Sequence, residues 1–174
     1  MRIIGGKFKG RRLVGVSDAT TRPTTDRVRE NVFNILGTKV RGAAVLDVFS
    51  GTGAYAAESL SRGAASVVAN DIDVGAQQLM RRNLGELTDR VKIWGLGYME
   101  LLNNLRGNKF DIVFLDAPYD SNFATQCVTF LFSQNMLETG AVVVVETDKD
   151  LNFEGYSVRT KKYGRARIYF LRMK

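Results

Sequence analysis

Apolar positions fall into short unbroken runs that alternate with stretches of helical spacing. The short runs predict buried strands at 43–49, 66–70, 91–94, 110–115 and 141–146. The helical spacing predicts helices at 54–62, 74–84, 99–105 and 122–133. Residues 156–162 and 165–172 predict two antiparallel strands around Tyr163 and Gly164. Because strand and helix alternate, we expect an α/β fold with a mainly parallel, seven-stranded sheet and a C-terminal antiparallel hairpin.

The first 16 residues differ from the rest in pattern. They predict two short strands with a turn at Gly5-Gly6 or at Gly10, which is a basic β-hairpin outside the main core. No linker or repeat follows. We therefore expect a single domain over 1–174, with 1–16 as an arm and 17–174 as the core.

A helix is predicted between the arm and the first strand. Pro23 keeps its predecessor extended, and Thr25 or Asp26 can cap a helix that runs to about Leu36. Its apolar face, expected to pack on the core, holds Val28, Val32, Ile35 and Leu36. Arg27 and Arg29 are expected to lie off that face.

A glycine-rich turn follows the first predicted strand. Leu46 to Gly53 reads Leu-Asp-Val-Phe-Ser-Gly-Thr-Gly. The two glycines allow a tight turn and bring main-chain N–H groups close to a ligand. Asp47 ends the strand, so its carboxylate should face the same ligand. The turn also fits the relaxed dinucleotide pattern with Asp71 as the ribose-binding acid, so NAD and S-adenosylmethionine (SAM) are both candidates. A carboxylate suits a cationic methionine group better than a pyrophosphate, which favours SAM.

Several strand ends carry residues suited to one ligand. Asp47, Asp71, Gly97 and Asp116 all follow or end a predicted strand, and the carboxyl ends of parallel strands share one edge. Asp71, with Asp73 as second choice, should accept hydrogen bonds from ribose hydroxyls, although either can instead be a helix N-cap. Gly97 and Tyr98 fall where the adenine would lie. The candidate cofactor-binding residues are Asp47, Phe49, Ser50, Gly51, Thr52, Gly53, Asp71, Ile72, Gly97 and Tyr98.

The loop after the fourth strand supplies candidate catalytic residues. It consists of Asp116, Ala117, Pro118 and Tyr119. A carboxylate and a nearby backbone carbonyl can accept both hydrogens of an exocyclic amine and orient its lone pair toward a sulfonium methyl group. Tyr119 can stack on the base that carries the amine. A strand-end turn without a role is the alternative.

Composition removes several kinds of chemistry. The chain has no histidine and a single cysteine, Cys127. This excludes Ser-His and Cys-His nucleophile pairs, an internal disulfide and a multi-cysteine zinc site, and no metal site is predicted. No apolar run approaches the ~20 residues of a membrane helix, and the start shows no signal-peptide pattern. We expect a cytoplasmic protein without a membrane partner.

The net charge of +7 is concentrated at the two ends. Residues 1–29 hold eight Lys and Arg against two acids, and residues 158–174 hold seven and no acid, whereas the middle carries ten against sixteen. This distribution predicts a polyanionic partner, with nucleic acid favoured over mere solvated charge. Phe8 could stack on a base. The candidate RNA-binding residues are Arg2, Lys7, Phe8, Lys9, Arg11, Arg12, Arg22 and Arg27.

Three segments carry a family resemblance. Arg22–Glu30 (Arg-Pro-Thr-Thr-Asp-Arg-Val-Arg-Glu), the turn from Asp47 to Gly53, and Leu60–Ala64 (Leu-Ser-Arg-Gly-Ala) resemble the RsmD family of bacterial 16S rRNA guanine-N2 methyltransferases. The resemblance spans essentially the whole chain. It implies a Rossmann-like class I SAM-dependent methyltransferase that modifies a guanine amine in 16S rRNA, on an assembled or assembling small ribosomal subunit.

Two positions depart from the pattern of the RsmD family. Ala117 replaces the first proline of an Asp-Pro-Pro loop, and Gly97 stands where relatives usually carry Asp or Asn. Three alternatives stay open: adenine-N6 methylation of DNA or RNA, a non-catalytic ribosome-assembly factor on the same scaffold, and an NAD-linked enzyme. We expect a monomer.

Overall fold

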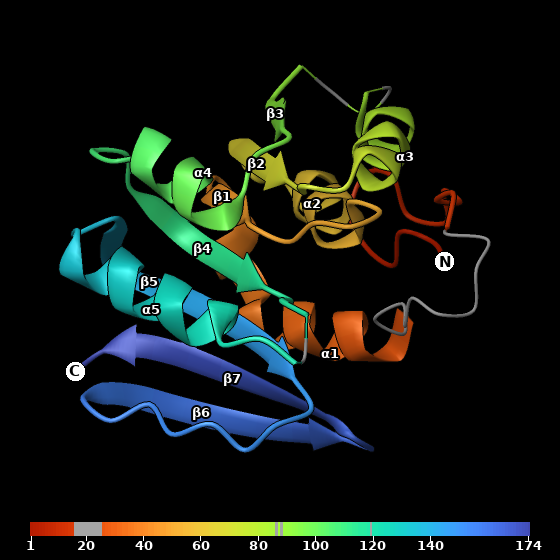
Figure 1. Cartoon of the computed structure of the whole chain (residues 1–174). Coiled ribbons are helices and arrows are strands. Elements are labelled where there is room, and N and C mark those ends of the chain that lie inside the picture. The colour runs from red at the N-terminus through yellow and green to blue at the C-terminus, as the bar shows by residue number, and fades with distance from the viewer. Residues whose placement is uncertain (16–25, 86, 88, 119) are drawn as a thin grey trace.

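A single seven-stranded sheet forms the centre of the computed structural model, which describes residues 1–15, 26–85, 87, 89–118 and 120–174 (Figure 1). The strand order is β3-β2-β1-β4-β5-β7-β6. Strands β1 to β5 are parallel, and β7 runs antiparallel to both β5 and β6. The strands are β1 Ala44–Asp47, β2 Ser66–Asn70, β3 Val91–Trp94, β4 Phe110–Leu115, β5 Leu137–Thr147, β6 Tyr156–Tyr163 and β7 Ala166–Met173. The predicted α/β fold with a C-terminal hairpin is confirmed.

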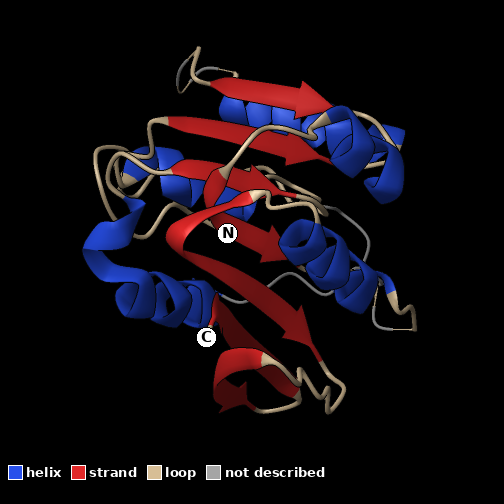
Figure 2. Ribbon diagram, turned by 90° about the vertical axis from the view of Figure 1, so that its left-hand side faces the viewer, coloured by secondary structure: helices blue, strands red, loops and turns tan. Residues whose placement is uncertain are grey.

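Helices cover both faces of this sheet, and Figure 2 shows the strands twisting between them. They are α1 Asp26–Leu36, the 3₁₀ turn η1 Gly37–Val40, α2 Ala54–Ser61, α3 Val74–Leu84, α4 Tyr98–Asn104 and α5 Phe123–Ser133. One apolar core lies between the sheet and α1, α2 and α3, and the other between the sheet and α4 and α5 (Figure 1). No helix in the described ranges is long and apolar enough to cross a membrane.

Helix α1 packs differently from the prediction in one respect. Val28, Val32 and Leu36 are buried as expected. Arg29 was expected to lie off the face that packs on the core, but its side chain is buried and 0% exposed. Its Nη2 donates to Asp26 Oδ1 at 2.9 Å, and its Nε lies 3.8 Å from Glu58 Oε2 on α2. A buried guanidinium requires such partners, and here they join α1 to α2.

The arm doubles back antiparallel, as predicted, but pairs through a single bridge between Arg2 and Arg12. The expectation that it lies outside the main core is wrong. Ile3 and Leu13 are 1% and 6% exposed and belong to the core on the α1–α3 side. Their apolar side chains make burial more favourable than solvation.

Helix α2 holds the arm through its polar side chains. Glu58 accepts hydrogen bonds from the backbone N–H groups of Ile4 at 2.8 Å and Gly5 at 2.9 Å. Gly6 has a φ of +78°, and a Cβ there would lie 1.9 Å from the Ser61 carbonyl oxygen, so only glycine fits. Lys7 N–H donates to that same carbonyl at 2.7 Å. The arm is therefore fixed by contacts distant in sequence.

Candidate active site

The carboxyl ends of β1, β2 and β3 are tied together by Asn70, the last residue of β2. Its side chain is 1% exposed, and its Nδ2 donates to the Val48 carbonyl at 3.1 Å and to the Leu96 carbonyl at 3.0 Å. Leu96 N–H returns a bond to Asn70 Oδ1 at 3.0 Å. Sequence reasoning missed Asn70, although an amide that ends an apolar strand beside Asp71 was a usable signal. The side-chain amide of Asn70 thus joins the segments that follow β1 and β3, which lie close together at this edge as predicted.

The glycine turn has the tight geometry expected of it. Gly53 has a φ of +80° and precedes α2, and a Cβ there would come within 3.2 Å of Leu84. Gly51 has a φ of +53°, and a Cβ there would meet nothing within 4 Å. The Gly51 N–H donates to Asp71 Oδ2 at 2.9 Å. That N–H therefore joins the turn to the residue that follows β2, and the space beside Gly51 is open.

Asp47 is a buried carboxylate with an unused oxygen. It is 1% exposed, and Ser50 Oγ donates to its Oδ2 at 2.6 Å. Its Oδ1 accepts no hydrogen bond from the described part of the chain. Burial raises the pKa of Asp47 to about 7, and the negative charge of Asp71 adds to this, against the lowering effects of the Ser50 hydroxyl and the Ala56 backbone N–H. A proton or a cationic ligand would compensate this carboxylate.

Asp71 and Asp73 have separate roles in the structure. Asp71 is half-buried, and its Oδ1 accepts from Asp73 N–H at 3.0 Å. Asp73 caps α3 by accepting from Ala76 N–H at 2.8 Å, so the N-cap alternative holds for Asp73. Between them Ile72 is 71% exposed, an unusual position for a large apolar side chain. Asp71 and Ile72 together offer a carboxylate next to an apolar surface.

Gly97 and Tyr98 begin α4 at the same edge. A Cβ on Gly97 would meet nothing within 4 Å, so the missing side chain leaves open space. The Tyr98 ring stacks on Phe123 with centroids 4.5 Å apart and lies 5.8 Å from Phe49, and its hydroxyl donates to Gln126 Oε1. These three half-buried rings form an aromatic cluster, of which sequence reasoning missed Phe123.

The loop after β4 places Asp116 half-buried at the end of the strand. Ala117 is 6% exposed and packs in the core on the α4–α5 side. The carbonyl of Pro118 accepts from Ser121 N–H at 3.1 Å and Ser121 Oγ at 2.6 Å. No donor within the described residues reaches the Ala117 carbonyl. Tyr119 lies outside the described residues, as does Arg22.

The arm lies against the glycine turn. Asn83 of α3 donates from Nδ2 to the Thr52 carbonyl at 2.8 Å and to the Val14 carbonyl at 3.0 Å, and it accepts from Val14 N–H. The Thr52 hydroxyl contacts Met1 Sδ at 3.8 Å. The side chain of Thr52 is therefore directed at the arm.

The candidate RNA-binding residues differ in exposure. Lys7, Lys9 and Arg12 are exposed, as are Arg2 and Arg27, whereas Arg11 is half-buried. Arg2 lies 3.9 Å from Asp26. Phe8 is half-buried and packs against the core, with Lys7 Nζ 5.4 Å from its ring centroid. Its ring is thus less available for stacking on a base than the sequence suggested.

Comparison with known proteins agrees with the resemblance over nearly the full chain. The family model described as Conserved hypothetical protein 95 matches residues 1–172. Ribosomal RNA small subunit methyltransferase D of Haemophilus influenzae is 34% identical over 154 residues, which cover 86% of this chain and 80% of that protein. The putative rRNA methyltransferase YlbH of Bacillus subtilis is 35% identical over 169 residues, which cover 93% and 92%.

A solved structure extends this agreement to the fold. The putative methyltransferase yhhF from Escherichia coli superimposes with a TM-score of 0.88 at 32% identity, covering 99% of this chain and 98% of that one. The methyltransferase fold expected from the resemblance is confirmed. The chain belongs to the Conserved hypothetical protein 95 family, which is the RsmD family of methyltransferases.

Proposed function

We propose that the protein transfers the methyl group of SAM to the exocyclic N2 amine of a guanine in small-subunit rRNA. The observation that carries this proposal is that Asp47, Asp71 and Asp116 stand at the carboxyl ends of the parallel strands β1, β2 and β4, where Asp47 Oδ1 is buried and accepts no hydrogen bond from the described residues. The named relatives support rRNA as the substrate class, and the family name supports the guanine amine.

The residues present fit SAM. The unpaired Asp47 Oδ1 matches a ligand with a cationic donor, and the open space beside Gly51 lets that ligand approach the turn. Asp71 would accept from the ribose hydroxyls, and the exposed Ile72 would cover one face of the adenine. Gly97 leaves room at the adenine edge. When bound, SAM supplies an electrophilic methyl group, so neither a metal ion nor a protein nucleophile is required.

The pH dependence of SAM binding follows from Asp47. Its pKa of about 7 means that it is largely protonated at pH 6 in the ligand-free protein. A cationic ligand favours the charged carboxylate, so binding releases a proton. We expect the affinity for SAM to rise roughly tenfold per pH unit below pH 7 and to level off above it. Calorimetry from pH 5.5 to 8.5, in two buffers of different ionisation enthalpy, measures both effects.

Asp47→Asn is the control for this dependence. Asparagine keeps the shape of the side chain but does not titrate. The affinity of this variant for SAM should therefore be weaker than that of the wild type at pH 8 and independent of pH. A wild-type affinity that stays constant across the range would contradict the role given to Asp47. No SAM binding at any pH would favour the non-catalytic assembly factor.

Asp116 and the Ala117 carbonyl would orient the guanine amine. Each can accept one of its two hydrogens, which exposes the nitrogen lone pair. As the new N–C bond forms, the S–C bond breaks, and the nitrogen loses a proton to Asp116 or to water. Positioning of this kind can be worth about 7–11 kcal/mol of barrier in favourable cases. Nucleoside analysis of the modified RNA distinguishes methylated guanine N2 from methylated adenine N6.

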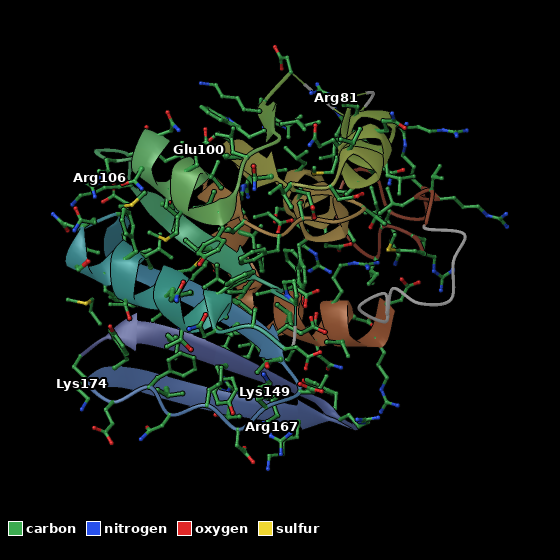
Figure 3. All side chains as sticks on the ribbon, viewed as in Figure 1. Arg81, Glu100, Arg106, Lys149, Arg167 and Lys174 are labelled. Atoms are coloured by element: carbon green, nitrogen blue, oxygen red, sulfur yellow. The ribbon has the colours of Figure 1, made fainter. Side chains whose placement is uncertain are left out.

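Basic residues near the active edge would hold the RNA. The exposed Lys7, Lys9 and Arg12 belong to the arm, whose first residue, Met1, contacts Thr52 of the glycine turn. Strand β6 runs in the same direction as β5, so the exposed Lys161 and Lys162 approach the carboxyl edge as well. Figure 3 shows Lys149 and Arg167 together near the carboxyl end of β5, and Arg106 and Lys174 on the far side of the molecule.

Charge reversal in the arm is expected to weaken RNA binding without affecting SAM. The triple variant Lys7→Glu, Lys9→Glu and Arg12→Glu loses up to three phosphate contacts. The slope of log affinity against log salt should therefore become shallower by roughly 2–3. Titration of labelled rRNA fragments across a salt series measures that slope.

A matched control changes the same charge at the opposite edge. Arg106→Glu, Lys109→Glu and Lys174→Glu alter exposed residues, of which Arg106 and Lys174 lie at the left-hand edge of the molecule in Figure 3 and Lys109 directly precedes the amino end of β4. These changes should reduce the slope much less. Equal slopes for the two triple variants would show that net charge, and not the arm, governs RNA binding.

A further inference from the structure

Glu146 and Tyr55 form a buried, hydrogen-bonded pair that has no role in the proposed methyl transfer as described above. Glu146 lies near the carboxyl end of β5 and is 5% exposed. The Tyr55 hydroxyl, from α2, donates to Glu146 Oε2 at 3.0 Å. A buried carboxylate is costly in free energy even when it accepts hydrogen bonds. Its presence at the edge that carries the site therefore points to a role in the chemistry there.

Sheet register brings Glu146 next to Asp116. Leu115 of β4 pairs with Val145 of β5 in parallel register. Asp116, directly after β4, and Glu146 of β5 therefore occupy the next positions along these two adjacent segments. Side chains alternate between the faces of a sheet, which puts Glu146 on the face covered by α1, α2 and α3. Its hydrogen bond to Tyr55 is on that face.

Both carboxylates act on the Tyr55 hydroxyl. Burial raises the pKa of the Tyr55 phenol well above its usual value, and the negative charges of Glu146 and Asp116 raise it further, against the opposing effect of Arg29. The phenol therefore keeps its proton and stays a donor. Its ring stacks on Phe114 with centroids 4.5 Å apart, which fixes the direction of the hydroxyl.

We propose that Glu146 is a positioning residue that acts on the methyl transfer through Asp116. Held by Tyr55, its negative charge makes Asp116 a stronger acceptor for the amine hydrogens and for the proton that leaves the nitrogen. Two neighbouring carboxylates repel each other, and proton uptake by one of them relieves the repulsion. The proton passes from the nitrogen to Asp116 and then to solvent, while the N–C bond forms and the S–C bond breaks. This inference rests on the proposed function.

The groups around Glu146 determine how its replacement changes the charge near Asp116. Among the described residues, Glu146 accepts from Tyr55 of α2 and pairs across the sheet with the apolar Ile168 of β7. The charges of Glu146, Asp116 and Arg29 all act on the Tyr55 phenol. Glu146→Gln keeps the shape and an acceptor for the hydroxyl but removes one of the two neighbouring negative charges. Since Asp116 then faces less repulsion, it should stay ionised down to a lower pH.

The test is the pH profile of methyl transfer to unmodified small subunits, from pH 5 to 9 at saturating SAM. Glu146→Gln should lower kcat about 10- to 100-fold, leave KM for SAM and for the subunit within about twofold, and move the acidic limb of the profile to lower pH. Tyr55→Phe keeps the ring and should lower kcat several-fold. Thr147→Val alters the next residue, on the opposite face, and should leave the limb in place.

Each outcome decides between the proposals. If the acidic limb of Glu146→Gln stays where it is in the wild type, or if the variant loses activity only through a higher KM, the positioning role is overturned. Methyl transfer by the wild-type protein would still support the proposed function in that case. Absence of transfer by the wild-type protein overturns both. Thermal unfolding shows whether each variant folds. If Glu146→Gln does not fold, Tyr55→Phe and the charge-retaining Glu146→Asp provide the test. Glu146→Asp should keep the acidic limb of its pH profile at the wild-type position.

Discussion

Replacement of Asp116 by alanine is expected to lower kcat for methyl transfer by about 10³-fold or more, while SAM binding stays within about twofold. The carboxylate would accept one hydrogen of the guanine amine and take up its proton, so its removal leaves the nitrogen lone pair without orientation. Asp116 is half-buried at the end of β4, separate from the Asp47 and Asp71 pair that would hold the cofactor. Single-turnover transfer and calorimetry with SAM measure the two quantities separately.

Asp120→Ala is the matched control for this variant. Asp120 belongs to the same loop and is exposed, so its removal should change kcat by less than about twofold. Normal turnover by Asp116→Ala would remove Asp116 from the mechanism. A parallel loss of SAM binding would instead show that Asp116 acts on the cofactor.

Replacement of Glu58 by alanine is expected to destabilise the fold by about 3–5 kcal/mol. Glu58 is 0% exposed and accepts from Ile4 and Gly5 N–H, and it pairs with Arg62 at 2.7 Å and with Arg29 at 3.8 Å. Its removal leaves two backbone donors of the arm without their acceptor, and it leaves the buried Arg29 guanidinium with Asp26 as its remaining carboxylate partner among the described residues. Urea unfolding measures the loss of stability.

Release of the arm should accompany this loss of stability. Proteolysis after Arg2, Lys7 and Lys9 should become faster in Glu58→Ala at urea concentrations where the protein is still folded. Glu30→Ala, an exposed glutamate on α1, should change stability by less than about 0.5 kcal/mol. An arm that stays protected in Glu58→Ala would mean that the packing of Ile3 and Leu13, with the backbone bonds from Lys7 to Ser61 and from Val14 to Asn83, holds it without Glu58.

Local signals were enough to predict most of the elements. The bounds of β2, α3, β3 and β4 match those expected from apolar runs and helical spacing, because each is a complete pattern within its own segment. The glycine turn was also predictable, since Gly51 and Gly53 adopt the positive φ values that a tight turn demands. The end of β1 was placed too late, because the chain leaves the sheet at Asp47 to form that turn.

Contacts between distant residues could not be predicted in this way. Arg29 was expected off the face that packs on the core, because its partner Glu58 lies on another helix and cannot be recognised from the local pattern. The arm was expected outside the core because nothing within it reveals the carboxylate that accepts its backbone N–H groups. Tyr55 and Glu146 are separated by 91 positions, and only the order of strands in the sheet brings them together. Sequence alone therefore predicts Asp47, Asp71 and Asp116 as candidate acids of the site, but it does not predict Tyr55 and Glu146, which the strand order brings to the same edge.

Incubation of the protein with methyl-labelled SAM and small ribosomal subunits lacking their methyl groups tests the central claim most directly. The labelled nucleotide is mapped in the 16S rRNA and digested to nucleosides. The proposed function predicts that the label appears in N2-methylguanosine at a discrete position, that it is absent with Asp116→Ala, and that it is retained with Asp120→Ala. Label in N6-methyladenosine, or no label from a protein that binds SAM, would contradict it.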